Sequence, residues 1–490
     1  MLSRGLAILA RNYTVLGDYP RGTALAREAA ALTAGDPVAD AQDQATLASL
    51  LNLQGKHAEA QQVARLALAA LPDDERPVRL QVMMEIARSE WNELQRAQAQ
   101  KTLEQAMALA QQSGNRVAQA ELHRQRGSWH ARLRHIRDAE SDMKQAIALA
   151  GASAPLVANE ARHSLAGLLL LEERATEAVQ VARVQLEEAR KRLGEAHPLV
   201  GRAWWRLANA QCVNAQLDAC ATSIGRADVV VRQSLGESHP DYADVLRIRS
   251  QLAAWRQPES DADIPLLRRA YAIMRAWYPR GNEHTQKMQT ELGSRLLAVR
   301  PASPQARTRN LDEALALLEA PLARQSATGV PLRPNHRSTL AQALLTRDAP
   351  GDRARVRALL AENLRVMAPY PQGYSARFSD GLCEAQLLLR EGDAAGAEAR
   401  VLALLPGLAR HQAVTSNRFS LRDAWLLRAE IAAGRGDRRQ ARVFLVDALR
   451  HTKASFGPRH PAARRLEDLL SAFDRTGRLA HSHSLSTRPA

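Results

Sequence analysis

The sequence is poor in aromatic residues and in lysine. Its 490 residues include 5 Phe, 7 Tyr and 7 Trp, and only six of the 67 Lys and Arg residues are lysines. Alanine, by contrast, is abundant. Small side chains suit closely packed helices better than sheets, which favour β-branched and aromatic residues. A chain of this length and composition is expected to form several domains or one elongated helical array.

Cysteines and long apolar segments are also scarce. Three cysteines, Cys212, Cys220 and Cys383, argue against a disulfide framework and for a reducing compartment, with the cytoplasm as the default location. The most apolar run, residues 165–171, is far shorter than the roughly 20 residues that span a bilayer, so no membrane helix is expected. Residues 5–10 are too few for the apolar core of a secretory signal.

The charge is positive but dispersed. A formal net charge of +15 comes from 67 Lys and Arg against 52 Asp and Glu. The arginines are scattered along the chain with acidic residues nearby, whereas nucleic-acid binding normally requires a basic cluster or a known module. The dispersed arginines therefore favour a partner other than nucleic acid, although the net charge of +15 leaves a direct nucleic-acid scaffold open as a further alternative.

Sequence motifs for catalysis are missing. The chain has no phosphate loop, no kinase catalytic loop, no G-x-S-x-G turn and no H-E-x-x-H helix. Cys212 and Cys220 have no nearby histidine to complete a zinc set. We therefore expect no enzyme activity, no cofactor and no metal site.

Small residues recur at fixed offsets. In the copy that starts at Ala48 they are followed 12 and 19 residues later by Ala60 and Ala67. Such residues let two antiparallel helices of a hairpin approach closely. Turn signals with glycine, such as Gly392-Asp393, separate the two helices. Copies begin at Ala10, Ala48, Ala87, Gly127, Ala166, Ala208, Ala385 and Ala429.

A second motif repeats with a period of 42 residues. LGEAHP at 193–198 returns as LGESHP at 235–240, and FGPRHP follows at 456–461. The glycine ends one helix and the proline starts the next. The histidines of this motif, His197, His239 and His460, precede proline, which indicates helix capping rather than metal binding.

This motif resembles the kinesin-light-chain type of tetratricopeptide repeat, found also in C-terminal regions of bacterial eukaryotic-like serine/threonine kinases and in some transcriptional regulators. The hairpin resemblance covers about residues 3–475, and the specific motif lies in 175–240 and 425–465. It implies an all-α fold, an α-solenoid that forms a right-handed superhelix of antiparallel helical hairpins. The concave groove of such a superhelix holds partner segments.

We expect one tetratricopeptide-like solenoid domain, residues 1–476, of about 11 hairpins, with a capping helix at 462–476 and a disordered tail at 477–490. Residues 241–380 fit the repeat poorly. They could form diverged repeats that still stack, or a hinge. Helical apolar spacing at 311–322 and 353–367 favours diverged repeats. Repeat-like sequence starts almost at the first residue, which suggests a further domain upstream.

The expected function is a non-catalytic scaffold or adaptor that binds a protein or peptide, with self-association left open. The alternative is the regulatory region of a bacterial serine/threonine kinase or transcriptional regulator whose effector domain lies elsewhere. Arg and Trp are favoured interface anchors, and Asn can hold a bound backbone, although each candidate could equally belong to an ordinary solvated helix face. The candidate groove residues are Arg88, Trp91, Glu121, Arg124, Ser128, Glu160, His163, Arg202, Trp205 and Asn209.

Overall fold

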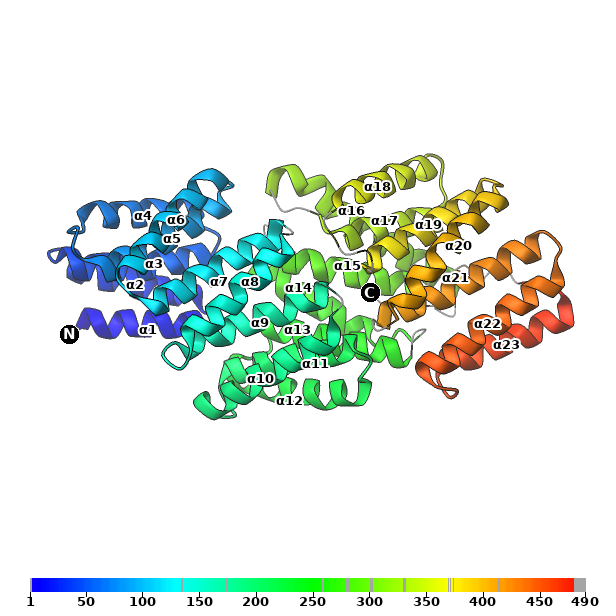
Figure 1. The fold of residues 1–490 in the computed structure, drawn as a ribbon, viewed down its shortest axis with the longest axis horizontal. Helices are drawn as coiled ribbons and strands as arrows, with labels where there is room; N and C mark the ends of the chain where they lie inside the picture. Colours follow the sequence, from blue (N-terminus) through cyan, green and yellow to red (C-terminus); the bar gives the residue numbers. More distant parts are fainter. Residues whose placement is uncertain are drawn as a thin grey trace. The chain divides into compact units, whose positions relative to one another are not determined.

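The computed structural model is all-α. It describes residues 2–133, 135–172, 174–257, 260–278, 283–299, 303–328, 332–368, 370, 372, 374–412 and 415–479. These residues form 23 α-helices and no strand (Figure 1). None of these helices is long and apolar enough to cross a membrane. Most of the predicted tail, from residue 480 on, and the predicted connections around 301 and 330 lie outside the described residues.

The helices follow one another with short connections. The first twelve are α1 (Leu2–Leu16), α2 (Tyr19–Thr33), α3 (Pro37–Leu53), α4 (His57–Ala70), α5 (Arg76–Asn92), α6 (Arg96–Gln112), α7 (Arg116–Leu133), α8 (Ile136–Ala150), α9 (Pro155–Leu171), α10 (Ala175–Leu193), α11 (Pro198–Val213) and α12 (Leu217–Leu235). The others are α13 (Pro240–Arg256), α14 (Ile264–Trp277), α15 (Glu283–Ala298), α16 (Pro304–Thr328), α17 (Pro334–Arg347), α18 (Asp352–Val366), α19 (Ser375–Arg390), α20 (Ala394–Arg410), α21 (Thr415–Gly434), α22 (Arg438–Phe456) and α23 (Pro461–Thr476).

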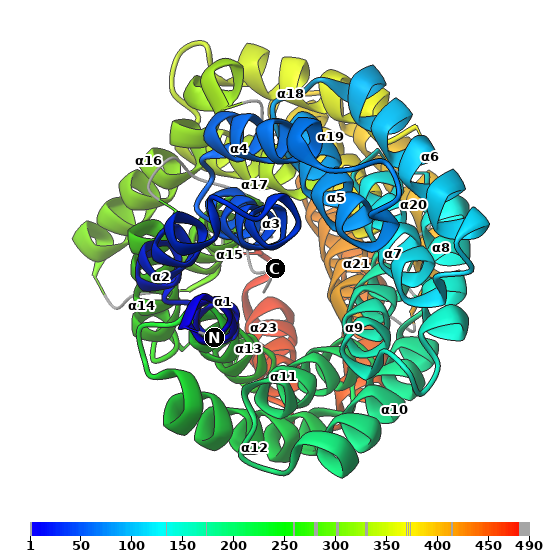
Figure 2. The same ribbon diagram turned by 90° about the vertical axis from the view of Figure 1, so that its left-hand side faces the viewer.

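The chain divides into two compact units. Unit 1 comprises Met1–Leu168, Val181–Ala203 and Val230–Gly236, and unit 2 comprises Leu169–Gln180, Trp204–Val229 and Glu237–Ala490. In unit 1, α1–α8 form four hairpins, and each odd-numbered helix up to α5 also packs against the next odd-numbered one. Figure 2 shows α4, α6 and α8 on the outer side of α3, α5 and α7. In unit 2, α13–α22 pack as consecutive hairpins, with α23 against α22.

The small residues at the repeat positions are buried where helices cross. Ala48, Ala60 and Ala67 all belong to one apolar core cluster of unit 1. A Cβ on Gly127 would lie 2.9 Å from the Cβ of Asp142, so α7 and α8 approach too closely for a larger side chain. The packing role predicted from the spacing is confirmed at these positions.

Helix ends follow the predicted chemistry. Gly194, Gly236 and Gly457 have φ angles of 79°, 82° and 90°, a conformation that glycine adopts without strain. The Nδ1 atoms of His197, His239 and His460 accept backbone hydrogen bonds from Leu199, Asp241 and Ala462 at 3.1, 3.1 and 3.2 Å. The capping role predicted for these histidines is confirmed.

The prediction about the cysteines is wrong for one pair. Cys212, near the end of α11, and Cys220, in the first turn of α12, form a disulfide with a Cα–Cα distance of 5.2 Å. Cys220 does occupy a repeat position against the paired helix. The tight α11–α12 turn places that position opposite Cys212, so the hairpin geometry itself brings the two sulfurs together. Cys383 is free and buried.

The last helix of unit 2 covers an apolar surface. Leu466, Leu469 and Phe473 of α23 are buried against α21 and α22. Just before this helix, Nε2 of His460 donates a hydrogen bond of 2.8 Å to the carbonyl oxygen of Trp255, at the end of α13 and 205 residues away in sequence. Unit 2 is therefore linked by a contact between distant repeats as well as by contacts between neighbours.

Candidate protein-binding surface

Alternating charges cross consecutive odd-numbered helices of unit 1. We call this set the charge ladder. Two of its residues come from α5, two from α7, one from α9 and one from α11. On each of these helices they lie on the side that does not pack against the second helix of the hairpin. Its members are Glu85, Arg88, Glu121, Arg124, Glu160 and Arg202.

Ion pairs connect the charge ladder within and between helices. Arg88 lies 3.1 Å from a carboxylate oxygen of Glu85 and 3.7 Å from one of Glu121 on the next odd-numbered helix. The Nε atom of Arg124 donates to Oε2 of Glu121 at 2.8 Å. Arg202 of α11 meets Glu160 of α9 at 3.0 Å. At the α3 end, Asn52 donates to Glu85 at 3.1 Å.

The side chains of the charge ladder are ionised, and their positive and negative charges cancel. Burial opposes the charge of Arg124, but Glu121, Glu160 and Glu85 outweigh it and raise the pKa of the guanidinium. Burial likewise opposes ionisation of Glu121, yet Arg124 and Arg88 lower the pKa of its carboxyl. The side chains of Arg124 and Arg202 are 22% and 33% exposed. The three acids balance the three arginines, and all of these side chains except the buried Glu85 are partly exposed.

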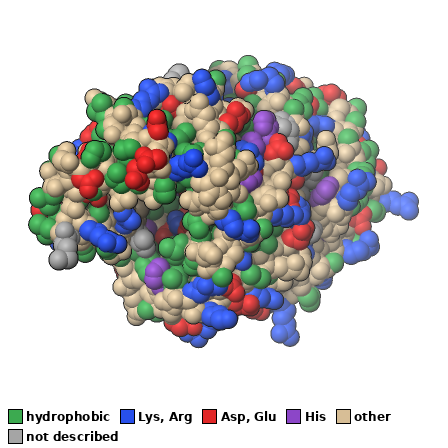
Figure 3. Space-filling view, turned by 60° about the vertical axis from the view of Figure 1, so that its left-hand side comes forward, with side chains coloured by type: hydrophobic (Ala, Val, Ile, Leu, Met, Phe, Trp, Pro, Cys, Tyr) green, Lys and Arg blue, Asp and Glu red, His purple; other side chains and the backbone are tan. Residues whose placement is uncertain are grey.

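Elsewhere on the molecule the two signs of charge are also interspersed. Figure 3 shows one face on which Lys and Arg side chains alternate with Asp and Glu. Many of these residues form ion pairs between successive outer helices, as Arg27 of α2 does with Glu59 of α4. Such exposed pairs contribute little to stability individually.

Two of the predicted groove residues are not available to a partner. Trp91 and Trp205 are only 4% and 5% exposed. The ring of Trp91 stacks on that of Trp129 with 4.4 Å between centroids, and the guanidinium of Arg96 lies over it. The prediction that these tryptophans offer their rings to a bound protein does not fit this burial, because both face the packed interior rather than the solvent side of their helices.

The other predicted residues support the helices locally. The hydroxyl of Ser128 donates to the carbonyl of Arg124 at 3.0 Å. His163 lies 3.5 Å from the side-chain amide of Gln185. Asn209 is buried and accepts a hydrogen bond of 3.4 Å from Arg247. The structure therefore brings together Arg88, Glu121, Arg124, Glu160 and Arg202 and leaves these three outside the ladder.

A second polar cluster, in unit 2, was missed by the sequence reasoning. Arg247 of α13 is buried and contacts Asp244 at 3.0 Å and Glu291 of α15 at 3.4 Å. Burial and then the nearby charge of Arg247 lower the pKa of Lys287, on α15, to about 7. The 42-residue period could have found part of this cluster, since it relates Arg202 to Asp244 and Trp205 to Arg247.

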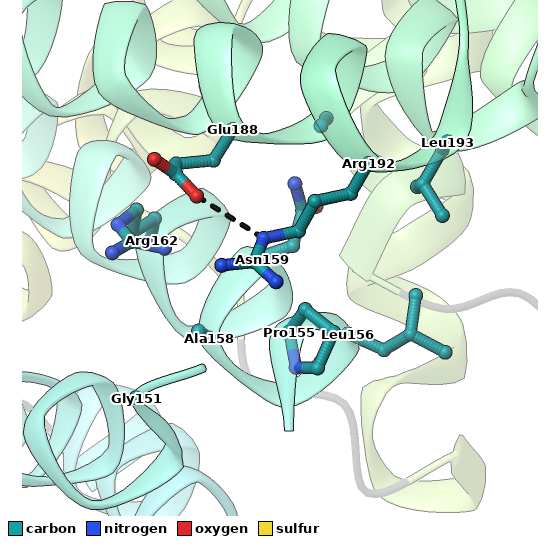
Figure 4. A pocket seen from close by; sticks show the side chains of 10 residues that line it. Gly151, Pro155, Leu156, Ala158, Asn159, Arg162, Glu188, Arg192 and Leu193 are labelled. Atoms are coloured by element: carbon teal, nitrogen blue, oxygen red, sulfur yellow. Dashed lines mark hydrogen bonds and ion pairs between the residues drawn. The ribbon is translucent and has the colours of Figure 1, made fainter. Parts of the chain in front are cut away.

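A shallow pocket lies between the first turn of α9 and the last turn of α10 (Figure 4). Arg192 pairs with Glu188 at 3.2 Å on its rim. Burial, followed by repulsion from Arg192, lowers the pKa of Arg162. Asn159 is held by Gln185 at 3.2 Å. Across the described part of the chain, no group of three or more His, Cys, Asp or Glu residues is arranged to hold a metal ion.

The helices and the ladder define an all-α solenoid of stacked hairpins with a polar surface on its first helices. No family model matches the chain, and no curated protein matches it. Among solved structures, a monomeric mutant of IFIT1 with Gppp-AAAA has a TM-score of 0.47 and 13% identity over 88% of this chain and 90% of that chain. Yeast Tom70 has a TM-score of 0.35 and 12% identity over 95% of this chain and 92% of its own. Likenesses this weak carry no argument about partners.

Proposed function

We propose that the chain is a non-catalytic scaffold of the tetratricopeptide kind that binds a protein or peptide segment along the charge ladder of unit 1. The observation that supports this is the row of alternating charges from Glu85 to Arg202, which is partly exposed from Arg88 onward. A link to a kinase or a transcriptional regulator rests only on the resemblance of the repeat motif.

The ladder suits an extended segment that carries both signs of charge. Each guanidinium is already held by a carboxylate, so little side-chain entropy is lost when a partner adds a further hydrogen bond. Because the ladder is neutral as a whole, it does not attract a polyanion over long range. Recognition would depend on the order of charges along the partner.

A peptide-display selection against the full chain tests this proposal. The affinity of the enriched peptides is then measured for the native protein and for a variant with Glu121→Gln and Arg124→Gln. This variant removes one ion pair of the charge ladder without changing the net charge. We expect at least a tenfold loss of affinity, as for loss of charge-assisted hydrogen bonds worth about 1.5–3 kcal/mol.

The matched control carries Arg27→Gln and Glu59→Gln, which removes an exposed ion pair on the outer helices α2 and α4. Peptide binding to this control should equal that of the native protein. If the selected peptides bind the ladder variant and the native chain equally, the ladder is not the binding surface.

Two features of the cysteines indicate different cellular compartments. Few cysteines favour the cytoplasm, whereas the bond between Cys212 and Cys220 favours an oxidising compartment, because cytosolic thiols are kept reduced. Alkylation of thiols in intact cells decides between the two. Protected Cys212 and Cys220 support an oxidising compartment, and two alkylated thiols support the cytoplasm.

A further inference from the structure

Two segments that are distant in sequence meet at one edge of unit 2. The guanidinium of Arg438, the first residue of α22, lies against Gly477, which ends α23. One turn further along α22, Arg442 pairs with Asp474 at 2.8 Å. The first turns of α22 therefore lie beside the last turn of α23, and the two helices run side by side in Figure 1.

This arrangement adds two arginines from the end of α23 to the four that lie within residues 435–442. We call the set the C-terminal arginine edge. Its aspartates are Asp437, which caps the start of α22, and Asp474. Arg435 donates to the carbonyl of Ala394 at 2.6 Å. The set comprises Arg435, Arg438, Arg439, Arg442, Arg475 and Arg478.

Four members of the edge have no acidic partner. Arg438, Arg439, Arg475 and Arg478 are exposed and form no ion pair with another described residue. Some arginines on other outer helices are paired, as Arg268 is with Glu313 on the next outer helix. The edge is thus a local departure from the interspersed charge of the outer faces.

The start of α22 carries two of the unpaired arginines, Arg438 and Arg439. The N-terminus of this helix is already capped, because the carboxylate of Asp437 accepts a hydrogen bond of 2.9 Å from the backbone N–H of Gln440. The positive potential of the edge therefore comes from its arginines, six against the two aspartates Asp437 and Asp474.

We propose that the C-terminal arginine edge binds the phosphate backbone of a nucleic acid without reading its sequence. The planar guanidinium forks match phosphate geometry, and the net charge of +15 attracts a polyanion. Residues 435–442 and 474–478 include no aromatic or large apolar side chain. The edge therefore has no aromatic side chain on which bases could stack and no apolar anchor for a peptide.

Binding of a labelled DNA duplex of about 20 base pairs to the full chain tests this proposal by fluorescence anisotropy at increasing salt. Four arginines that each displace a counterion predict a slope of about −3 to −4 for log K against log salt. Changing Arg438, Arg439, Arg475 and Arg478 to Gln should weaken binding at least tenfold and bring the slope close to zero.

The control changes four exposed arginines at dispersed positions, Arg116, Arg183, Arg226 and Arg307, to Gln, which lowers the net charge equally. It should keep the slope of the native chain. Equal losses in both variants, or no binding at about 50 mM salt, would overturn the proposal. So would competition by a polyglutamate peptide as strong as that by unlabelled duplex, which would identify an acidic protein segment as the partner. Circular dichroism confirms that each variant is folded.

Discussion

Lys287 is the most perturbed basic side chain of the unit 2 cluster. Burial and the neighbouring Arg247 lower its pKa to about 7, while Glu291 and Asp244 partly offset this. A lysine that loses its proton near neutrality is an unusually good nucleophile. Its position among buried charges explains this property without any catalytic role.

We predict that acylation of Lys287 by an amine-reactive ester levels off above about pH 8, because the amine is then already deprotonated. Mass spectrometry of the labelled peptide measures the rate at each pH. Glu291→Gln removes an acidic neighbour and should move the midpoint to lower pH. A rate for Lys287 that still rises steeply at pH 9 would contradict the prediction.

His336 is a buried histidine with both ring nitrogens engaged. Nδ1 lies 2.8 Å from the hydroxyl of Thr290, and Nε2 lies 2.7 Å from the carbonyl of Leu318. Burial lowers its pKa from 6.5 to about 4, although the bond to Leu318 partly offsets this. The folded chain therefore holds this ring neutral where the unfolded chain protonates it.

The sign of the resulting pH dependence follows from proton binding. Between pH 6.5 and 4 the unfolded chain binds the extra proton, so the free energy of unfolding falls on acidification. At pH 5 the loss from His336 should be about 2 kcal/mol. Urea unfolding measures the free energy of unfolding of the native protein and of His336→Gln at pH 7 and pH 5. The native protein should lose about 2 kcal/mol more than the variant between these two pH values. Parallel pH profiles for the two would contradict this.

At this scale the sequence predicted residue types better than their environment. Arg88, Glu121 and Arg124, which were predicted as groove residues, lie together and form ion pairs, and their role in binding stays a prediction. Trp91 and Trp205 were misplaced because burial depends on a contact between helices, such as the stacking of Trp91 on Trp129. No spacing within one repeat contains that information.

At the scale of the helix, glycines separate into two kinds. Gly127 lies where α7 and α8 touch, whereas a Cβ on Gly225 of α12 would meet nothing within 4 Å. Gly127→Leu should therefore destabilise the protein by about 2 kcal/mol or more through overpacking. Gly225→Ala should stabilise it by about 0.5–1 kcal/mol, because alanine favours the helix. Thermal unfolding of both variants measures these two effects. Equal changes in stability would contradict the distinction between a glycine at a helix contact and a glycine in open space.

The hairpin α11–α12 is closed by the disulfide. A bond that encloses this short loop stabilises the folded state by about 2–3 kcal/mol by restricting the unfolded chain. The double change Cys212→Ala and Cys220→Ala should lower stability by this amount, as seen in urea unfolding. Reductant should destabilise the native chain and leave the double variant unchanged. Three free thiols in the denatured, unreduced protein would show that the bond is absent.

The helical hairpins were largely predictable, because each needs only local signals. Small residues mark where two helices cross, glycine ends one helix, and aspartate or histidine caps the next. Around residues 241–380 these signals fade. There, polar contacts between distant residues contribute to the packing, as between Arg295 and Asp263 at 2.8 Å. Such contacts have no fixed offset that a sequence pattern could reveal.

For the whole molecule, the bond from His460 to Trp255 is unusual, since the repeats of a solenoid normally contact only their neighbours. His460→Asn keeps a capping oxygen for α23, but its shorter side chain does not place a donor where Nε2 meets Trp255. We predict that amide hydrogens at the end of α13 exchange about fivefold faster in this variant, as for loss of one hydrogen bond of about 1 kcal/mol.

Mass-resolved hydrogen exchange measures this effect. His197→Asn is the matched control, because it changes the same position of the repeat motif in unit 1. Exchange at the end of α13 should be unchanged in that control. Equal acceleration in both variants would mean that the contact between His460 and Trp255 contributes nothing.

The same contact has a consequence for biosynthesis. An array of neighbouring hairpins can fold as it leaves the ribosome, each hairpin docking on the one before. The end of α13, however, must wait for the 205 residues that separate Trp255 from His460. At a typical synthesis rate of about 5–20 residues per second this takes roughly 10–40 seconds. During that interval the carbonyl oxygen of Trp255 lacks its partner, so this part of unit 2 reaches its final hydrogen bonding only after α22 has been made.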